Sequence, residues 1–240
     1  MGIIDDYKAG NVIGEIKKQI PFALSRALND VAIEVKKAEQ IEMSKVFDNP
    51  TPYTLNSIFF KKATKQKLEV QIIVRNEAAK GTAPVKYLEP QIFGGSRRAK
   101  SSELQLREKG LIDNDMFWAP GSGARLNQYG NISPGLIVQI LSALKAFREV
   151  GYDANYTEAS VKRNKKSLAG NIFVIKEWGK ALYPGVYQRT KKGVKPLLIF
   201  LKNPQYKERF DFFKVGEEVY DKEFENKFNE AIQYALSTAR

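Results

Sequence analysis

The feature that most restricts the fold is a stripe of apolar residues that repeats at helical spacing after Pro21. The stripe consists of Phe22, Leu24, Ala27, Leu28, Val31, Ala32 and Val35. Proline suits the first turn of a helix because its missing N–H has no intrahelical partner there. We therefore expect one long amphipathic helix that begins at Pro21 and ends between Ala38 and Val46, after a loose segment over residues 1–20.

The next segment changes from helical to strand periodicity. Asn49-Pro50-Thr51-Pro52 stops the helix, because each proline fixes its own backbone and pushes the preceding residue toward extended geometry. Ser57–Ala63 is a strand-like run, and Lys67–Asn76 is a second one with Leu68, Val70, Ile72 and Val74 on one face. The short connection Thr64-Lys65-Gln66 predicts that these two strands form an antiparallel hairpin.

The second half of the chain predicts further helices and strands. Ser101 or Ser102 is suited to cap a short helix that Gly110 ends, and Ser133-Pro134 is typical of a helix start. We expect that second helix to end at Gly151. Strands are predicted over 171–178 and over 196–201, where the nearly unbroken apolar run indicates a central strand. The last predicted element is a helix that carries Val219, Phe224, Phe228, Ala231, Ile232, Ala235 and Leu236.

This order of elements predicts an α+β fold. We expect an antiparallel or mixed sheet with the long N-terminal helix, the middle helix and the C-terminal helix packed on it. A single domain over residues 1–240 is predicted, with extended loops at about 77–100 and 119–133. Four aromatic residues are expected to dock the last helix onto the sheet: Tyr206, Phe210, Phe212 and Phe213.

The residue types present limit the chemistry that the chain can perform. It contains no cysteine and no histidine, which excludes disulfides, zinc sites built from Cys or His, cysteine nucleophiles and Ser-His-Asp triads. Asp30 and Glu34-Val35-Lys36 faintly resemble a metal-dependent nuclease core, but they lie in a helical pattern where a nuclease would use strands. We therefore expect no enzyme activity, no cofactor and no metal.

The net charge is +12 and is unevenly distributed. Residues 215–240 contain three basic and six acidic side chains, a net of −3, so the rest of the chain carries +15. Such a separation suits nucleic acid, an acidic protein neighbour or head-to-tail contact between copies, as well as simple solubility. No apolar stretch approaches the roughly 20 residues of a membrane span. We expect synthesis in the cytoplasm and no membrane association.

Two basic clusters are candidates for contact with a DNA backbone. Loops that combine lysine or arginine with nearby aromatic residues can bind phosphates without reading sequence. Solvated loops, or salt bridges to a neighbouring subunit, explain the clusters equally well. The candidate residues are Arg97, Arg98 and Lys100 in the first cluster and Lys162, Arg163, Lys165 and Lys166 in the second.

Several segments are explained fully by neither turn chemistry nor core packing, and they carry a resemblance to a known family. The segments are Pro50–Ser57, Tyr87–Arg98, Tyr129–Gly135 and Tyr183–Arg189. Together they resemble the minor tail protein Z type of tail-assembly proteins in tailed phages and prophages. The resemblance covers most of the chain, from Phe22 to Ala239, and rests on sequence signatures without any catalytic motif.

The resemblance implies a structural virion protein that acts in tail completion and head-tail joining at the neck. Its expected partners are other copies in a ring, neighbouring neck and tail proteins, and packaged double-stranded DNA contacted without sequence specificity. The expected location is the virion, after synthesis in the host cytoplasm. Candidate subunit-interface residues within the segments are Tyr53, Tyr183, Pro184, Gln188 and Arg189.

The alternative interpretation is a nucleic-acid-binding or metal-dependent DNA-processing protein. Its support is the basic character of residues 1–214. The lack of a convincing acidic metal-binding cluster on the predicted strands argues against the processing enzyme.

Overall fold

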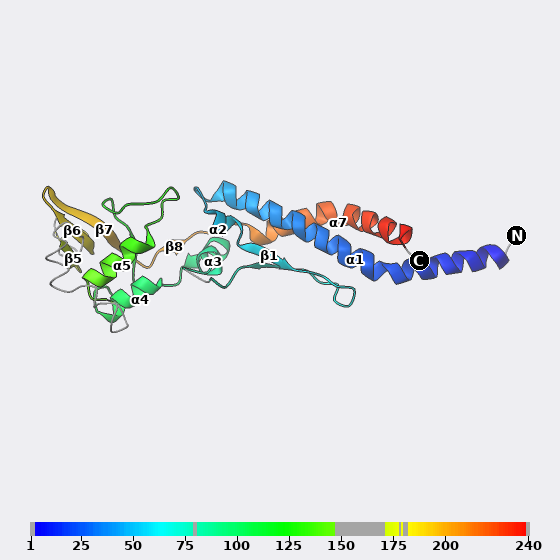
Figure 1. Cartoon of the computed structure of the whole chain (residues 1–240), viewed down its shortest axis with the longest axis horizontal. Helices are drawn as coiled ribbons and strands as arrows, with labels where there is room; N and C mark the ends of the chain where they lie inside the picture. Colours follow the sequence, from blue (N-terminus) through cyan, green and yellow to red (C-terminus); the bar gives the residue numbers. More distant parts are fainter. Residues whose placement is uncertain (1–2, 79–80, 147–170, 178, 180–181, 239–240) are drawn as a thin grey trace. The chain divides into compact units, whose positions relative to one another are not determined.

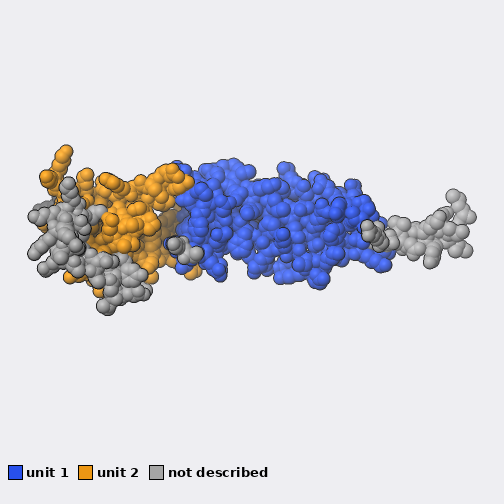
Figure 2. Space-filling view, viewed as in Figure 1, with its two compact units in different colours: residues 1–93, 208–240 blue, residues 94–207 orange. Residues whose placement is uncertain are grey.

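The computed structural model describes residues 3–78, 81–146, 171–177, 179 and 182–238 (Figure 1). The chain divides into two compact units, shown in different colours in Figure 2. Unit 1 contains residues 1–93 and 208–240, and unit 2 contains residues 94–207. Helices and antiparallel strands occur in both, so the α+β class is confirmed. The chain was expected to form a single domain, but unit 2 is inserted into the sequence of unit 1.

Unit 1 is built on two long antiparallel helices, α1 (Ile3–Val46) and α7 (Phe212–Ser237), which lie side by side (Figure 1). Their contact includes four buried alanines with large apolar residues around them. The alanines are Ala23, Ala27, Ala231 and Ala235. Small side chains let two helix backbones approach closely, which explains why alanine occupies these positions.

The expected start of the first helix is wrong. The helix already begins at Ile3, and Pro21 lies inside it. An interior proline leaves the carbonyl four residues earlier without its helical hydrogen bond. That carbonyl belongs to Lys17, an exposed residue, so water can satisfy it. The C-terminal end, at Val46, agrees with the prediction.

The remaining elements of unit 1 pack against α1. The helix α2 (Pro52–Leu55) precedes the antiparallel hairpin of β1 (Ile58–Lys61) and β2 (Gln71–Val74), as predicted. The helix α3 (Val85–Phe93) follows. The expected loop over 77–100 is therefore partly wrong, because Leu88 of α3 is buried in a cluster with Met43, Ile58 and Phe210.

The aromatic segment before α7 belongs to this cluster and not to a large sheet. Phe210 is 1% exposed and makes edge-to-face contacts with Phe47 and Phe212. The C-terminal helix was expected to pack on the main sheet, but it packs on α1 within unit 1. Phe213 is 59% exposed and contacts the ring of Phe93, which is also exposed.

Unit 2 contains a four-stranded antiparallel sheet with the order β4, β7, β6, β5. The strands are β4 (Met116–Pro120), β7 (Gly193–Lys202), β6 (Gly185–Thr190) and β5 (Ile172–Ile175). The position of β7 between two neighbours confirms that the apolar run over 196–201 is central. A second, small sheet pairs β3 (Gly95–Ser96) with β8 (Gln205–Tyr206).

Two helices of unit 2 contribute to the core of its sheet. In α5 (Pro134–Ala143), the hydroxyl of Ser133 accepts a hydrogen bond from the Leu136 N–H at 3.2 Å, as the predicted cap requires. The helix ends before Gly151, because Lys145 adopts a positive φ of 52° and the Ala146 N–H donates to the Leu141 carbonyl. The shared core includes Leu106 of α4 (Ser101–Glu108), Ile140, Leu141, Val186, Leu198 and Phe200.

The glycine-rich segment after β4 is irregular, as expected for the predicted loop over 119–133, although β4 extends into its start at Ala119 and Pro120. The Gly121 N–H donates to the Leu197 carbonyl at 2.9 Å. A Cβ atom at Gly121 would collide with the Pro196 carbonyl oxygen. Gly121 is therefore required by close packing against β7 and is not a flexible spacer.

Candidate subunit and nucleic-acid interface

Arg97 was a candidate DNA contact, but its guanidinium forms an ion pair inside unit 2. Its two terminal nitrogens donate to the two carboxylate oxygens of Glu103 at 2.9 and 2.6 Å. The Arg97 side chain is 11% exposed and that of Glu103 is fully buried. Burial alone would raise the pKa of Glu103, but hydrogen bonds from Arg97 and from two backbone N–H groups lower it below its ordinary value.

Lys100 lies beside this pair. Its ammonium group sits 3.8 Å from the centre of the Trp118 ring, a cation–π contact. Burial, and then the positive charge of Arg97, lower the pKa of Lys100 to about 8. Arg97 and Lys100 therefore position α4 against β4. Arg98, the third residue of this cluster, has an exposed side chain.

The second basic cluster was predicted over Lys162, Arg163, Lys165 and Lys166. All four residues lie outside the residues that the structure describes. The expectation that they contact DNA stays a prediction.

The candidate subunit-interface residues fall into both units. Tyr53 is in α2 of unit 1 and is 41% exposed, and Tyr183 precedes β6 of unit 2 and is 60% exposed. Pro184 is buried and Gln188 is half-buried. Arg189 is exposed, with its guanidinium 5.2 Å from the centre of the Phe173 ring. Exposure therefore fits an interface best at Tyr53, Tyr183 and Arg189.

Two of the segments that carry the family resemblance meet in unit 1. Thr51 caps α2 by accepting a hydrogen bond from the Thr54 N–H at 3.1 Å. The Thr54 hydroxyl is 3.2 Å from the Tyr87 hydroxyl. The motif Pro52-Tyr53-Thr54-Leu55 therefore has a structural role, because it connects the start of the hairpin with α3.

The hairpin carries a basic surface that the sequence analysis did not single out. Its exposed basic residues are Lys61, Lys62, Lys65, Lys67 and Arg75. Lys67 pairs with Glu69, and Lys65 lies over the Phe22 ring. Within the described part of the chain, Lys61, Lys62 and Arg75 have no ion-pair partner. The run Lys61-Lys62-Ala63-Thr64-Lys65-Gln66-Lys67 is the sequence signal for this surface, because four of its seven residues are lysine.

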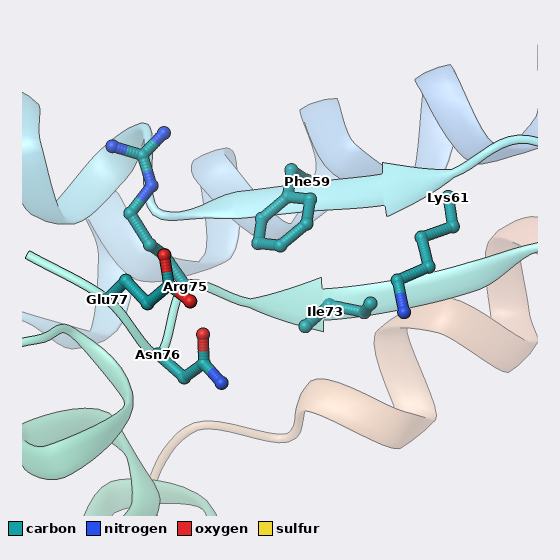
Figure 3. A pocket seen from close by; sticks show the side chains of 6 residues that line it. All are labelled: Phe59, Lys61, Ile73, Arg75, Asn76 and Glu77. Atoms are coloured by element: carbon teal, nitrogen blue, oxygen red, sulfur yellow. The ribbon is translucent and has the colours of Figure 1, made fainter.

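A depression lies on one face of this hairpin (Figure 3). Phe59 and Ile73 are directly opposite each other in the β1–β2 register, and both are half-buried. In Figure 3 their side chains lie between those of Lys61 and Arg75. Asn76 and Glu77 complete the lining. The depression thus offers an apolar floor between two cations.

The opposite charge is concentrated on α7. Glu217, Asp221 and Glu225 follow one another at intervals of four residues and are all exposed, so they lie along one side of the helix. None of the three has an ion-pair partner among the described residues, whereas Glu218, Glu223 and Glu230 each pair with a lysine. Unit 1 therefore bears both a basic and an acidic surface.

Comparison with protein-family models, with curated proteins and with solved structures found no match to this chain. In the described part of the chain, no three acidic side chains are arranged to hold a metal ion. No helix of that part combines the length and apolar character needed to cross a membrane.

Proposed function

We propose that this chain is a structural virion protein of a tailed phage or prophage that acts in tail completion and head-tail joining at the neck. The proposal starts from the resemblance of its sequence segments to minor tail proteins of the Z type. Its role is structural and not catalytic, and its partners are other copies, neighbouring neck and tail proteins, and the packaged DNA.

The observation that carries the proposal is the separation of charge within unit 1. The hairpin presents three exposed cations, Lys61, Lys62 and Arg75. The helix α7 presents three exposed carboxylates, Glu217, Asp221 and Glu225. None of the six has an ion-pair partner among the described residues. Two unlike surfaces on one subunit support heterologous contacts, in which each copy uses one surface to meet the other surface of its neighbour. Rings around a central channel are assembled by contacts of this kind.

The direct test is electron microscopy of lysates from the parent phage or prophage with this gene interrupted by a stop codon. We expect DNA-filled heads beside separate, unjoined tails. An intact copy of the gene on a plasmid should restore joined particles. Normal infectious particles from the interrupted gene would exclude an essential joining function.

A second candidate function is non-specific nucleic-acid binding, and the lysine-rich hairpin favours it. Removing one lysine that binds a phosphate should reduce the slope of log K against log salt concentration by about 0.9 for duplex DNA. Reversing the charges of Lys62 and Lys65 should therefore reduce the slope by about 2 if both bind phosphates. Magnesium-dependent cleavage of DNA by the same preparation would favour the processing enzyme instead.

A further inference from the structure

The depression on the hairpin lies on the face that the core of unit 1 does not use. Successive strand residues point to opposite faces. Ile58 is fully buried in the core cluster, with Ile72 and Val74 packed against that cluster. Phe59 and Ile73 belong to the opposite, outer face. A cross-strand pair of an aromatic and a β-branched residue is a stable apolar contact that a partner can extend.

The lining favours a protein over a nucleic acid as the occupant. Two cations alone would suit a phosphate backbone, but Glu77 also lines the depression and would repel phosphates. Phe59 is the one floor residue with a planar surface on which a base could stack, because its cross-strand partner Ile73 is aliphatic. An apolar floor between Lys61 and Arg75 fits an aromatic side chain flanked by carboxylates.

The described part of the chain contains such a surface on α7. Tyr220 is 42% exposed and stacks on Phe224 at a ring distance of 4.8 Å. Tyr220 follows Glu217 by three residues and directly precedes Asp221 on the helix. We call Glu217, Tyr220, Asp221 and Glu225 the acidic ridge. It combines an aromatic residue, the type that dominates binding energy at interfaces, with carboxylates that have no ion-pair partner among the described residues.

We propose that the outer face of the β1–β2 hairpin binds the acidic ridge of a second copy of this chain. Tyr220 of one copy packs against Phe59 and Ile73 of the next, and the carboxylates of the ridge meet Lys61 and Arg75. Because the two surfaces differ, every copy can use both at once, and the contact propagates into a ring or a filament. This inference rests on the proposed function and identifies which surfaces join the copies.

The test is the mass of the full chain in solution, measured by light scattering after size exclusion, for a hairpin variant (Lys61→Glu with Arg75→Glu) and a ridge variant (Glu217→Lys with Asp221→Lys). We expect an assembled wild-type protein, and a 27.2 kDa monomer for each variant alone. An equimolar mixture of the two variants should assemble again, because each then carries the complement of the other. A chain with all four substitutions should also assemble.

The matched control reverses two exposed lysines of unit 2, Lys191→Glu with Lys192→Glu, which changes the net charge as much as the hairpin variant does. It should assemble like the wild type. Circular dichroism verifies that each variant is folded. At a protein concentration of about 1 mM, even a contact with a dissociation constant of about 1 mM would produce assembly. A wild-type protein that remains monomeric at this concentration would overturn the inference. So would variants whose mass is unchanged, or a mixture that fails to assemble.

Binding of duplex DNA tests nucleic acid as the alternative occupant of the depression. If the hairpin variant loses DNA binding while its mass stays that of the wild type, the hairpin contacts nucleic acid and the copy-to-copy contact is wrong. The two proposals can also fail separately. Reassembly of the mixed variants alongside normal particles from the interrupted gene would contradict only the neck function. Unjoined tails with unchanged variant masses would contradict only the proposed contact.

Discussion

Arg97 and Glu103 form a doubly hydrogen-bonded ion pair in which the carboxylate is fully buried. The same carboxylate accepts the backbone N–H groups of Lys100 at 2.6 Å and of Trp118 at 3.0 Å. One acidic side chain thus connects the segment after β3, the start of α4 and the strand β4. The Arg97 guanidinium is therefore engaged by Glu103 within the fold of unit 2.

Replacing Arg97 by alanine should therefore destabilise the protein. Removing one partner of a buried ion pair leaves the other charge buried and uncompensated, which costs about 3–5 kcal/mol. Chemical denaturation followed by circular dichroism measures the change. The exposed Arg125→Ala in the same unit is the control and should shift the free energy of unfolding by less than about 0.5 kcal/mol. Unchanged stability of Arg97→Ala, combined with weaker DNA binding, would restore Arg97 as a DNA contact.

Glu39 predicts a pH dependence of stability. It lies in the buried stripe of α1, four residues from Val35 and from Met43, and its carboxylate oxygens have no hydrogen-bond partner within the described structure. Burial, and then the nearby Glu42, raise its pKa from 4.5 to about 8. The folded protein therefore retains a proton between these pH values that the unfolded chain releases, so the free energy of unfolding falls as pH rises from about 4.5 to 8.

Thermal and chemical denaturation between pH 5 and pH 9 test this effect with Glu39→Gln. Through this group, the free energy of unfolding of the wild type should fall by at most about 1.4 kcal/mol per pH unit. The variant should not show this fall. Glu34→Gln is the control, because Glu34 is partly exposed and pairs with Lys37 at 2.9 Å. Parallel stability profiles for the wild type and Glu39→Gln would show that Glu39 is not protonated in the fold.

Gly185 should not tolerate a side chain. In the sheet it pairs with Ile199, and a Cβ atom there would collide with the Leu198 carbonyl oxygen. We expect Gly185→Ala to cost about 1–3 kcal/mol through overpacking. Gly135→Ala is the matched control, since the site is helical and no atom beyond its chain neighbours and the backbone of its own helix lies within 4 Å of its Cβ position. Denaturation curves of equal midpoint for Gly185→Ala and the wild type would disprove the close approach of β6 and β7.

The close contact between α1 and α7 depends on alanine. Ala27 is fully buried against Ala231 and Ala235. Leucine at position 27 should force the helices apart and lower the free energy of unfolding by about 1–3 kcal/mol. Ser44→Leu adds a similar volume at an exposed position of the same helix and should have little effect. If both variants unfold like the wild type, the two helices do not pack at this distance.

Local sequence patterns predicted the elements that are specified by residues close to one another along the chain. The hairpin of β1 and β2 follows from two strand-like runs, the second with alternating apolar residues, and from the turn residues between them. The start of α5 follows from Ser133 and Pro134. Local sequence patterns did not predict elements that are stabilised by contacts with residues distant in sequence. The helix α3 was missed because glycine, proline and basic residues surround it, yet Leu88 is buried among residues far away in sequence.

The candidate site also combines features that are visible in the local sequence with features that depend on contacts between distant residues. Clustered basic residues were visible in the sequence at positions 97–100, but nothing local indicated that Glu103 would be buried and would bind Arg97. The exposed basic surface belongs instead to the hairpin, where Phe59 and Ile73 become neighbours only through strand pairing. A charge is available to a partner only if the fold leaves it unpaired.

Composition and apolar periodicity were sufficient to predict the α+β class, the apolar stripes of α1 and α7, and the exclusion of cysteine and histidine chemistry. The packing of α7 on α1, the separate unit over residues 94–207 and the identity of the buried charges became apparent from the folded chain alone. Periodicity depends on neighbours along the chain. Burial and ion pairing depend on neighbours in space, which residues distant in sequence supply.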